Sequence, residues 1–121
     1  MEPVKPFAFN VVDSAKLNEA FRYVVFTSAY SQHTLMAVID SIPKEKHEYA
    51  DQTIMIVDGS AKVIVDDTAE YNLMANQVIV IPANTYHEVV NTGAKAVKIY
   101  TIYSPPMHPA HEYLETRPLN D

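Results

Sequence analysis

The chain has 121 residues and no cysteine, and 48% of its residues are hydrophobic. This length fits one domain with one core, and the composition excludes a disordered chain, a disulfide framework and a thiolate metal site. The formal net charge of -6, without a cluster of Lys or Arg, excludes binding to nucleic acid or to an anionic membrane. No apolar run approaches the roughly 20 residues of a membrane span, and residues 1–6 lack the pattern of a secretory signal, so we expect a cytoplasmic protein.

Short hydrophobic or alternating runs, broken by turn residues at intervals of about ten, predict an all-β chain. One short helix is expected at residues 14–21, where Asp13 or Ser14 is suited to cap the first turn. The expected strands follow at residues 23–27, 34–39, 53–58, 61–65, 77–81, 86–91 and 96–103. This order predicts a single domain (1–121) made of an N-terminal arm (1–22), a barrel (23–103) and a C-terminal tail (104–121). The tail is expected to lie across the barrel or across a partner.

Turn residues mark the ends of several of these strands. Gly59, between two hydrophobic runs, is free to adopt the positive φ that tight hairpins require. Pro82 ends the run 78–81, because proline has no N–H to donate to a sheet. The chain has only two glycines, so we expect Asn and Asp at the other positive-φ positions.

Two groups of polar residues stand out against this β pattern. The first contains His47, Tyr49, Gln52 and Gly59, and the second contains Asn76, Pro82, Asn84, His87 and Asn91. Their order resembles the two motifs of a small single-domain cupin, G-x5-H-x-H-x3,4-E-x6-G and G-x5-P-x-G-x2-H-x3-N. The second motif keeps every spacing, with Asn at both Gly positions. In the first motif Tyr49 stands for the second His, and the two residues between Tyr49 and Gln52 are fewer than the pattern allows.

The resemblance implies a double-stranded β-helix, the jelly-roll barrel of the cupins, and a homodimer. It implies that His47 and His87 bind a divalent transition metal (Zn, Ni, Fe, Mn, Co or Cu), with Gln52 in place of a carboxylate ligand. Tyr49 takes the remaining ligand position, and three interpretations of it stay open. It is a phenolate ligand, or a catalytic phenol that donates a hydrogen bond to substrate or metal-bound water, or a core residue that fills the space of a lost ligand.

Strand alternation leaves the ligands of the first motif open. In a regular strand His47 and Tyr49 share a face with Asp51 and not with Gln52. Asp51 is therefore the alternative ligand, unless a bulge or turn at residues 50–51 shifts the alternation.

Several other residues are interpreted from their surroundings. Tyr86 and Tyr100, together with Tyr49, are candidates for lining a substrate pocket, and ordinary barrel core is the alternative for them. Residues 44–46 are expected to form a solvated loop. His108 and His111, in the tail, are expected at the surface or at the rim of the pocket.

The leading function is a metal-dependent cupin that binds a small polar or anionic molecule and acts as an oxygenase, isomerase or decarboxylase. A site without a carboxylate leaves the charge of the metal uncompensated, so an anionic ligand is expected to complete the coordination. The alternative is a non-catalytic cupin that binds or senses a sugar or an acid and has a degraded metal site. A third hypothesis is a structural oligomer with a vestigial site.

Overall fold

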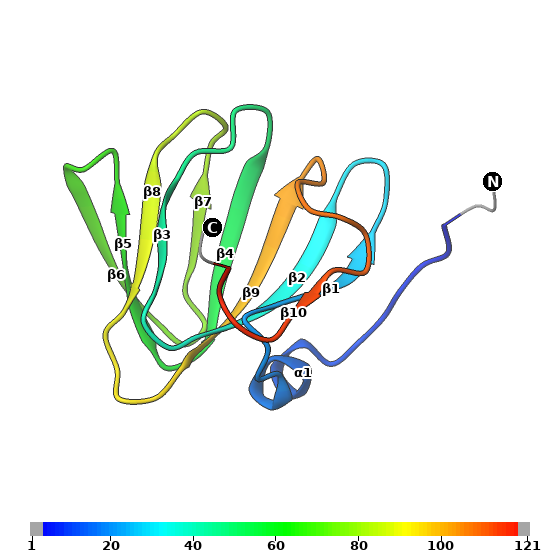
Figure 1. Ribbon diagram of the computed structural model, residues 1–121, viewed down its shortest axis with the longest axis horizontal. Coiled ribbons are helices and arrows are strands. Elements are labelled where there is room, and N and C mark those ends of the chain that lie inside the picture. Colours follow the sequence, from blue (N-terminus) through cyan, green and yellow to red (C-terminus); the bar gives the residue numbers. More distant parts are fainter. Residues whose placement is uncertain (1–3, 119–121) are drawn as a thin grey trace.

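The computed structural model describes residues 4–118, which form two antiparallel β-sheets packed face to face (Figure 1). The larger sheet has the strand order β10-β1-β2-β9-β4-β7 and the smaller has the order β3-β8-β5-β6. In chain order the elements are α1 (Val11–Leu17), β1 (Arg22–Thr27), β2 (Gln32–Val38), β3 (Ser41–Glu45), β4 (Asp51–Asp58), β5 (Ser60–Val65), β6 (Ala69–Met74), β7 (Val78–Ile81), β8 (His87–Asn91), β9 (Val97–Ser104) and β10 (Tyr113–Leu114). The predicted all-β jelly roll is confirmed. The outermost parts of the predicted arm and tail, residues 1–3 and 119–121, lie outside the described residues.

Some elements differ from those predicted. Three strands were not expected, and β3 and β6 among them lie at the two edges of the smaller sheet. Pro43 argues against a strand in general but is tolerated at an edge, where one N–H is not needed for pairing. The helix begins earlier than predicted, because the Asn10 side chain accepts a hydrogen bond from the Asp13 backbone N–H at 3.0 Å and caps it there.

The interior of the barrel is apolar at one end and polar at the other. Alternate residues of a strand share a face, so β9 places first Ile99 and then Tyr103 inside. Its partner β2 changes in the same way, with Met36 opposite Ile99 and Gln32 opposite Tyr103. The apolar layer contains Met36, Val38, Ile42, Ile54, Ile56, Val63, Val89, Val97 and Ile99, and the polar layer, at the upper end in Figure 1, contains Gln32, Thr34, Gln52, His87, Thr101 and Tyr103.

Asparagine takes the place of glycine in the turns. Asn76 and Asn84 have φ of 73° and 65°, and Gly59 has φ of 93° in the turn between β4 and β5. Short polar side chains such as Asn tolerate this left-handed conformation better than most residues do. Asp66 and Asp67 also have positive φ, so the prediction that Asn and Asp fill these positions is confirmed for four of the five non-glycine residues concerned among the described residues, and His111, with φ of 64°, is the exception.

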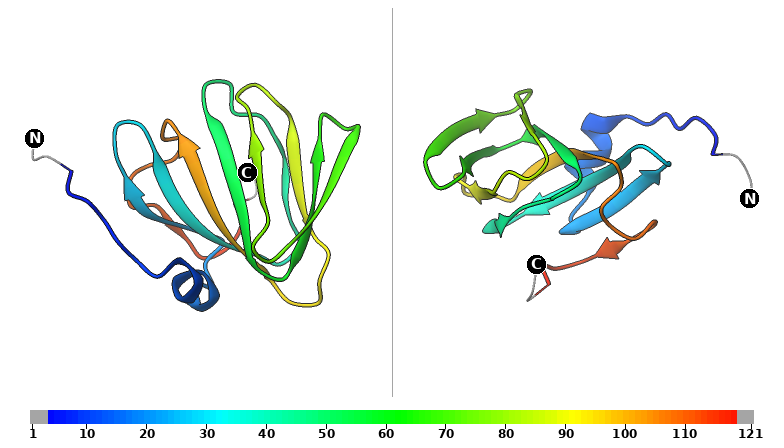
Figure 2. Two further views of the ribbon diagram at one scale, coloured as in Figure 1. Left: turned by 180° about the vertical axis from the view of Figure 1, so that it is seen from behind. Right: turned by 90° about the horizontal axis from the view of Figure 1, so that it is seen from above.

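The C-terminal tail lies against the barrel itself, where β10 pairs with β1 (Figure 2). The buried Gln32 side chain holds the tail by hydrogen bonds to the backbone of the tail. Gln32 Nε2 donates to the His108 carbonyl at 2.7 Å, and Gln32 Oε1 accepts from the N–H groups of Met107 and His108 at 3.2 and 2.9 Å. The Arg22 Nη1 adds an ion pair to Glu112 Oε1 at 3.1 Å.

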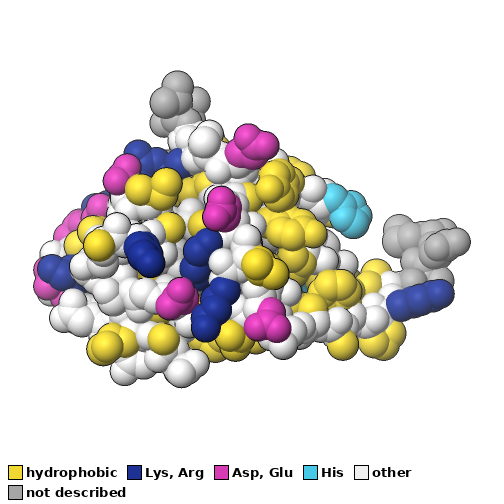
Figure 3. Space-filling view, turned by 90° about the horizontal axis from the view of Figure 1, so that it is seen from below, with side chains coloured by type: hydrophobic (Ala, Val, Ile, Leu, Met, Phe, Trp, Pro, Cys, Tyr) yellow, Lys and Arg dark blue, Asp and Glu magenta, His cyan; other side chains and the backbone are white. Residues whose placement is uncertain are grey.

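The N-terminal arm covers the outer face of the larger sheet. The Phe7 ring lies 5.1 Å from the Phe9 ring and 5.6 Å from the Phe26 ring, and Phe9 packs edge-on against Tyr100 at 5.9 Å. Seen from below, hydrophobic side chains gather toward the arm, and charged side chains of both signs mix toward the other side (Figure 3). Among the described residues, no helix combines the length and the apolarity needed to cross a bilayer.

The Asn91 side chain ties together the loops at the apolar end. Its Nδ2 donates to the carbonyl oxygens of Val38, Ile39 and Lys95 at 3.2, 2.9 and 2.8 Å. Its Oδ1 accepts from the Gly93 N–H at 2.9 Å. The last residue of the second motif therefore joins the turn after β2 to the loop after β8.

We predict that Asn91→Ala lowers the free energy of unfolding by about 2–3 kcal/mol, since each lost hydrogen bond contributes roughly 0.5–1.5 kcal/mol. Urea unfolding followed by circular dichroism measures the change. Asn72→Ala, on an exposed part of β6, is the control and is expected to change the value by less than about 0.5 kcal/mol. An equally small effect of Asn91→Ala would contradict the role assigned to this side chain.

Candidate metal centre

Three side chains converge at the polar end of the barrel. Glu45 ends β3, His47 lies in the loop that follows, and His87 begins β8, where it pairs with Glu45. Glu45 Oε1 lies 3.4 Å from His47 Nε2 and 3.5 Å from His87 Nε2. One ligand atom from each residue fits within 4.8 Å of the other two. Both imidazoles are buried, at 8% and 2% exposure. We call these three residues the Glu-His-His cluster.

A β-bulge in β3 turns Glu45 into the barrel. Ile42 pairs with Val89 and Glu45 pairs with His87, so three steps along β3 correspond to two steps along β8. The extra residue shifts the alternation, and Ile42 and Glu45 both face inward. The bulge thus lies before His47, and a turn at residues 48–49, just before the bulge or turn expected at 50–51, interrupts the alternation again.

Two hydrogen bonds hold the loops that carry the histidines. The Asn84 N–H donates to the His47 carbonyl at 2.8 Å. The Ala83 N–H donates to Asp51 Oδ1, also at 2.8 Å. These bonds join the β3–β4 loop to the β7–β8 loop, so the positive-φ turn at Asn84 and the position of His47 depend on each other.

The imidazoles present unpartnered nitrogens to a carboxylate. His87 Nδ1 lies 3.2 Å from the Thr85 carbonyl, which only accepts, so Nδ1 carries a proton. Nε2 then faces Glu45, either as an N–H toward the carboxylate or as a lone pair for a metal. Neither His87 Nε2 nor His47 Nε2 makes a hydrogen bond, although both atoms are buried. Buried polar atoms normally have a partner. Two imidazole nitrogens and a carboxylate together are a ligand set for a divalent transition metal.

The Glu45 carboxylate is ionised at neutral pH. Burial alone would raise the pKa of Glu45, but attraction to the His47 and His87 rings outweighs burial and lowers the pKa to about 2. The cluster therefore contains a full negative charge in a partly desolvated position.

The orientation of the Gln52 amide is fixed by its neighbours. The Thr101 hydroxyl donates to the Thr53 carbonyl at 2.9 Å, so its oxygen is left to accept. Gln52 Nε2 donates to this oxygen at 3.1 Å and to the Tyr103 hydroxyl at 3.3 Å. Gln52 Oε1 is buried and makes no hydrogen bond. Gln52 therefore offers the polar layer an acceptor oxygen.

Tyr103 connects the cluster to the tail. Its ring packs edge-on against the His47 ring at 5.4 Å and against the His108 ring at 4.9 Å. Burial, followed by the positive charge of Arg22, lowers the pKa of His108, so this imidazole is neutral at neutral pH.

The structure brings His47 and His87 together and places Gln52 in the same layer, but it separates Tyr49 and Asp51 from them. Tyr49 is 83% exposed and lies outside the cluster and outside the core, so the structure supports none of its three interpretations as a ligand, a catalytic phenol or a core residue. The alternation argument fails because residues 46–50 form a loop and not a strand. Asp51 is exposed and accepts the Ala83 hydrogen bond, which accounts for its carboxylate without a metal.

The two other predicted pocket tyrosines also lie elsewhere. Tyr86 is 45% exposed, and the Nζ atoms of Lys44 and Lys46 lie 5.0 and 4.9 Å from its ring centre. Tyr100 is on the outer face of β9, where its hydroxyl lies 2.7 Å from His33 Nδ1. It is three residues from Tyr103, so the two rings point to opposite faces of the strand.

Glu45 is the residue of the candidate site that the sequence interpretation missed, and the solvated loop expected at 44–46 is wrong for it, because it ends β3. The signal was the irregular spacing of the first motif. Shifted by two residues, Glu45-x-His47-x4-Gln52-x6-Gly59 keeps every spacing, with Glu45 at the first His position and His47 at the second. Tyr49 then falls outside the motif.

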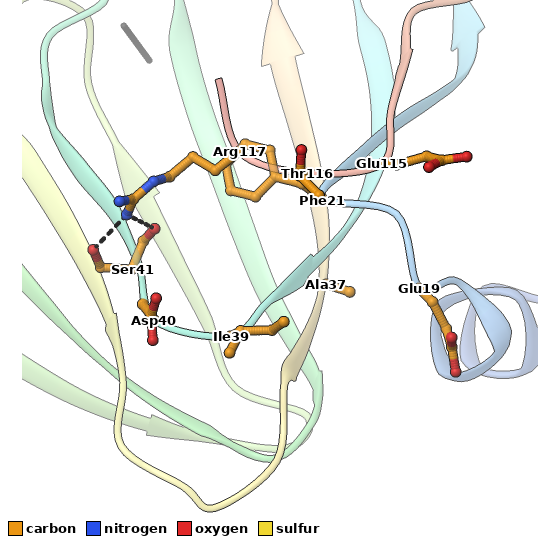
Figure 4. A pocket seen from close by; sticks show the side chains of 9 residues that line it. All are labelled: Glu19, Phe21, Ala37, Ile39, Asp40, Ser41, Glu115, Thr116 and Arg117. Atoms are coloured by element: carbon orange, nitrogen blue, oxygen red, sulfur yellow. Dashed lines mark hydrogen bonds between the residues drawn. The ribbon is translucent and has the colours of Figure 1, made fainter. Parts of the chain in front are cut away.

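A cavity of about 270 Å³ lies at the other end of β3, between the tail and the turn after β2 (Figure 4). Arg117 Nη1 crosses it and donates to the Ser41 carbonyl at 2.9 Å and to Ser41 Oγ at 3.1 Å. This cavity belongs to the attachment of the tail and not to the Glu-His-His cluster.

Comparison with known proteins agrees with this architecture. Residues 33–103 match the family described as Cupin domain. The chain is 35% identical over 120 residues to the uncharacterized protein YrkC of Bacillus subtilis (strain 168), covering 93% of this chain but only 64% of YrkC. It is 34% identical over 117 residues to the uncharacterized protein L612 of Acanthamoeba polyphaga mimivirus, covering 93% of this chain and 73% of L612.

The crystal structure of BH2720 from Bacillus halodurans is similar over nearly the whole chain. Its TM-score is 0.88 at 35% sequence identity, and the match covers 92% of this chain and 89% of that one. The family match spans more than half of the sequence and includes β2 to β9. The chain belongs to the cupin family.

Proposed function

We propose that this chain is a metal-binding cupin in which Glu45, His47 and His87 hold a divalent transition metal. A tetrahedral site with metal–ligand bonds of about 2.0–2.1 Å has neighbouring ligand atoms about 3.3–3.4 Å apart. The two distances from Glu45 Oε1, 3.4 and 3.5 Å, agree with this value. Two of the three distances between ligand atoms therefore suit a metal, and the two histidine nitrogens lie within 4.8 Å of each other.

The unpartnered Nε2 atoms of His47 and His87 carry the proposal. Both atoms are buried and lie 3.4 and 3.5 Å from the ionised Glu45 carboxylate, close enough to interact with it, yet neither makes a hydrogen bond. A cation among the three atoms gives all of them a partner at once. Gln52 Oε1, a buried acceptor in the same layer, is proposed as an additional neutral ligand.

Glu45 also changes the expected chemistry of the ligand. It supplies one negative charge that a site of His47, His87 and Gln52 would lack, so a single positive charge remains on the metal site for a bound molecule to balance. It supports a working metal site over the degraded site of the binding or sensing alternative. The two-imidazole, one-carboxylate set suits Zn²⁺, Fe²⁺, Mn²⁺, Co²⁺ or Ni²⁺.

A metal held in this way supplies Lewis-acid activation of an oxygen-bearing ligand. The chain contributes a fixed frame around it: the Gln52 amide is oriented by Thr101 and Tyr103, and the His87 ring by the Thr85 carbonyl. The apolar layer closes the barrel beneath. We place the reaction among oxygenations, isomerisations and decarboxylations of a small polar molecule.

We predict that Glu45→Gln weakens Zn²⁺ or Co²⁺ binding by at least about 100-fold, because it removes the only charge in the ligand set. Isothermal titration of protein purified without a histidine tag measures the affinity, and elemental analysis gives the stoichiometry, expected to be one ion per chain. His47→Ala and His87→Ala are expected to abolish binding.

Glu48→Gln and Tyr49→Phe are the matched controls, since both positions are exposed residues of the same loop. Both variants are expected to bind the metal within about twofold of the wild-type affinity. The proposal fails if wild-type protein takes up no metal, or if Glu45→Gln binds as tightly as Glu48→Gln.

Gln52→Glu is predicted to make stability depend on the metal. A second carboxylate near Glu45 raises metal affinity by about tenfold or more, and without metal it lowers the free energy of unfolding by about 1–3 kcal/mol through repulsion and desolvation. Thermal unfolding in EDTA and in excess Zn²⁺ separates the two effects. A variant that is as stable as wild type in EDTA and gains no affinity would show that Gln52 lies outside the metal's reach.

A further inference from the structure

A third imidazole, His108, faces the polar layer from the tail. Its Nδ1 lies 3.9 Å from Glu112 Oε1, and its Nε2, on the far side of the ring, is buried and makes no hydrogen bond. The ring contacts Tyr103, which in turn contacts His47. Buried polar atoms normally have a hydrogen-bond partner, so this nitrogen is available to accept a hydrogen bond from a bound molecule.

His108 is held there by more contacts than a surface tail requires. Gln32, which is fully buried, makes three hydrogen bonds to the backbone of Met107 and His108. On the other side, Glu112 is fixed by its ion pair with the buried Arg22. The tail therefore presents His108 in one orientation, as the supporting residues of a binding site do.

The hydrogen-bonding capacities at this place are those of acceptors. The carboxylate of Glu112 only accepts, so it favours the tautomer of the neutral His108 ring with the proton on Nδ1, which leaves a lone pair on the buried Nε2. Gln52 Oε1 is already assigned to the metal, so His108 Nε2 is the acceptor of the polar layer that is left for a bound molecule. Inward-facing acceptors beside a metal suit a ligand that donates hydrogen bonds, such as a hydroxyl group.

We propose that His108 contacts the small molecule bound at the metal centre and accepts a hydrogen bond from its hydroxyl group. The ligand class is thus a small hydroxylated molecule. This inference rests on the proposed function, because it places the ligand beside the Glu-His-His cluster. It gives the C-terminal tail a role in recognition and makes Gln32 a positioning residue.

Titration of the Co²⁺-loaded protein with glycolate and with acetate tests the proposal, with the visible absorption of Co²⁺ as the readout. The two acids share a carboxylate, and only glycolate has a hydroxyl. Wild-type protein is expected to prefer glycolate. His108→Phe, which keeps the ring contact with Tyr103, is expected to reduce this preference about fivefold, the value of one hydrogen bond of about 1 kcal/mol, with Co²⁺ affinity within about twofold.

Two further variants separate recognition from general damage to the tail. His111→Asn changes an exposed neighbour and is expected to keep the wild-type preference. Gln32→Met fills the same space without hydrogen bonds and is expected to lose the preference as His108→Phe does, which also covers the case that His108→Phe does not fold. If wild-type protein binds no Co²⁺, the proposed function is overturned and the ligand role of His108 with it. If Co²⁺ binds and glycolate is preferred equally with and without His108, this inference alone is overturned.

Discussion

The inward turn of Glu45 is the constraint on which the polar end of the barrel depends. A carboxylate is costly to bury unless opposite charge or hydrogen bonds compensate it. The bulge in β3 places it directly beside two imidazoles, and their attraction outweighs the cost of burial, as its lowered pKa shows. The positions of His47 and His87 are in turn set by the paired loops and by the Thr85 carbonyl. Each of these groups is poorly satisfied alone, and together they define a place for a cation.

Burial of apolar side chains at the other end of the barrel offsets the cost of burying these polar groups. Residues such as Ile54, Ile99 and Val89 are fully buried between the sheets. Each contributes roughly 1.5–3 kcal/mol by leaving water. The tail adds a separate set of contacts at the open side, where Gln32 and Arg22 bind it through polar groups. Folding and ligand chemistry are therefore carried by different layers of one small barrel.

The sequence was sufficient for the fold and for half of the candidate site. The second motif could be interpreted because Asn84 and His87 belong to a turn and a regular strand, whose spacing translates directly into geometry. Glu45 could not be placed by alternation, since a bulge changes which residues face inward and leaves no mark on local hydrophobicity. Tyr49 is two residues after His47 and would share its face in a strand, but alternation of side chains does not apply to the loop in which both residues lie. His108 joins the polar layer through its ring contact with Tyr103 and through Gln32, which lies 76 residues away in the sequence.

The boundary between the two layers lies within single strands, between Ile99 and Thr101 on β9 and between Thr34 and Met36 on β2. A substitution on the polar side of this boundary alters the polar groups that face a ligand. The residues on the apolar side, which exclude water, remain unchanged. Such a substitution changes stability only through the contacts of the polar layer, as expected for Gln52→Glu, and leaves the apolar layer intact. The polar layer is thus the part of this barrel where substitutions can change which ligand is bound. The apolar layer is the part that keeps such variants folded.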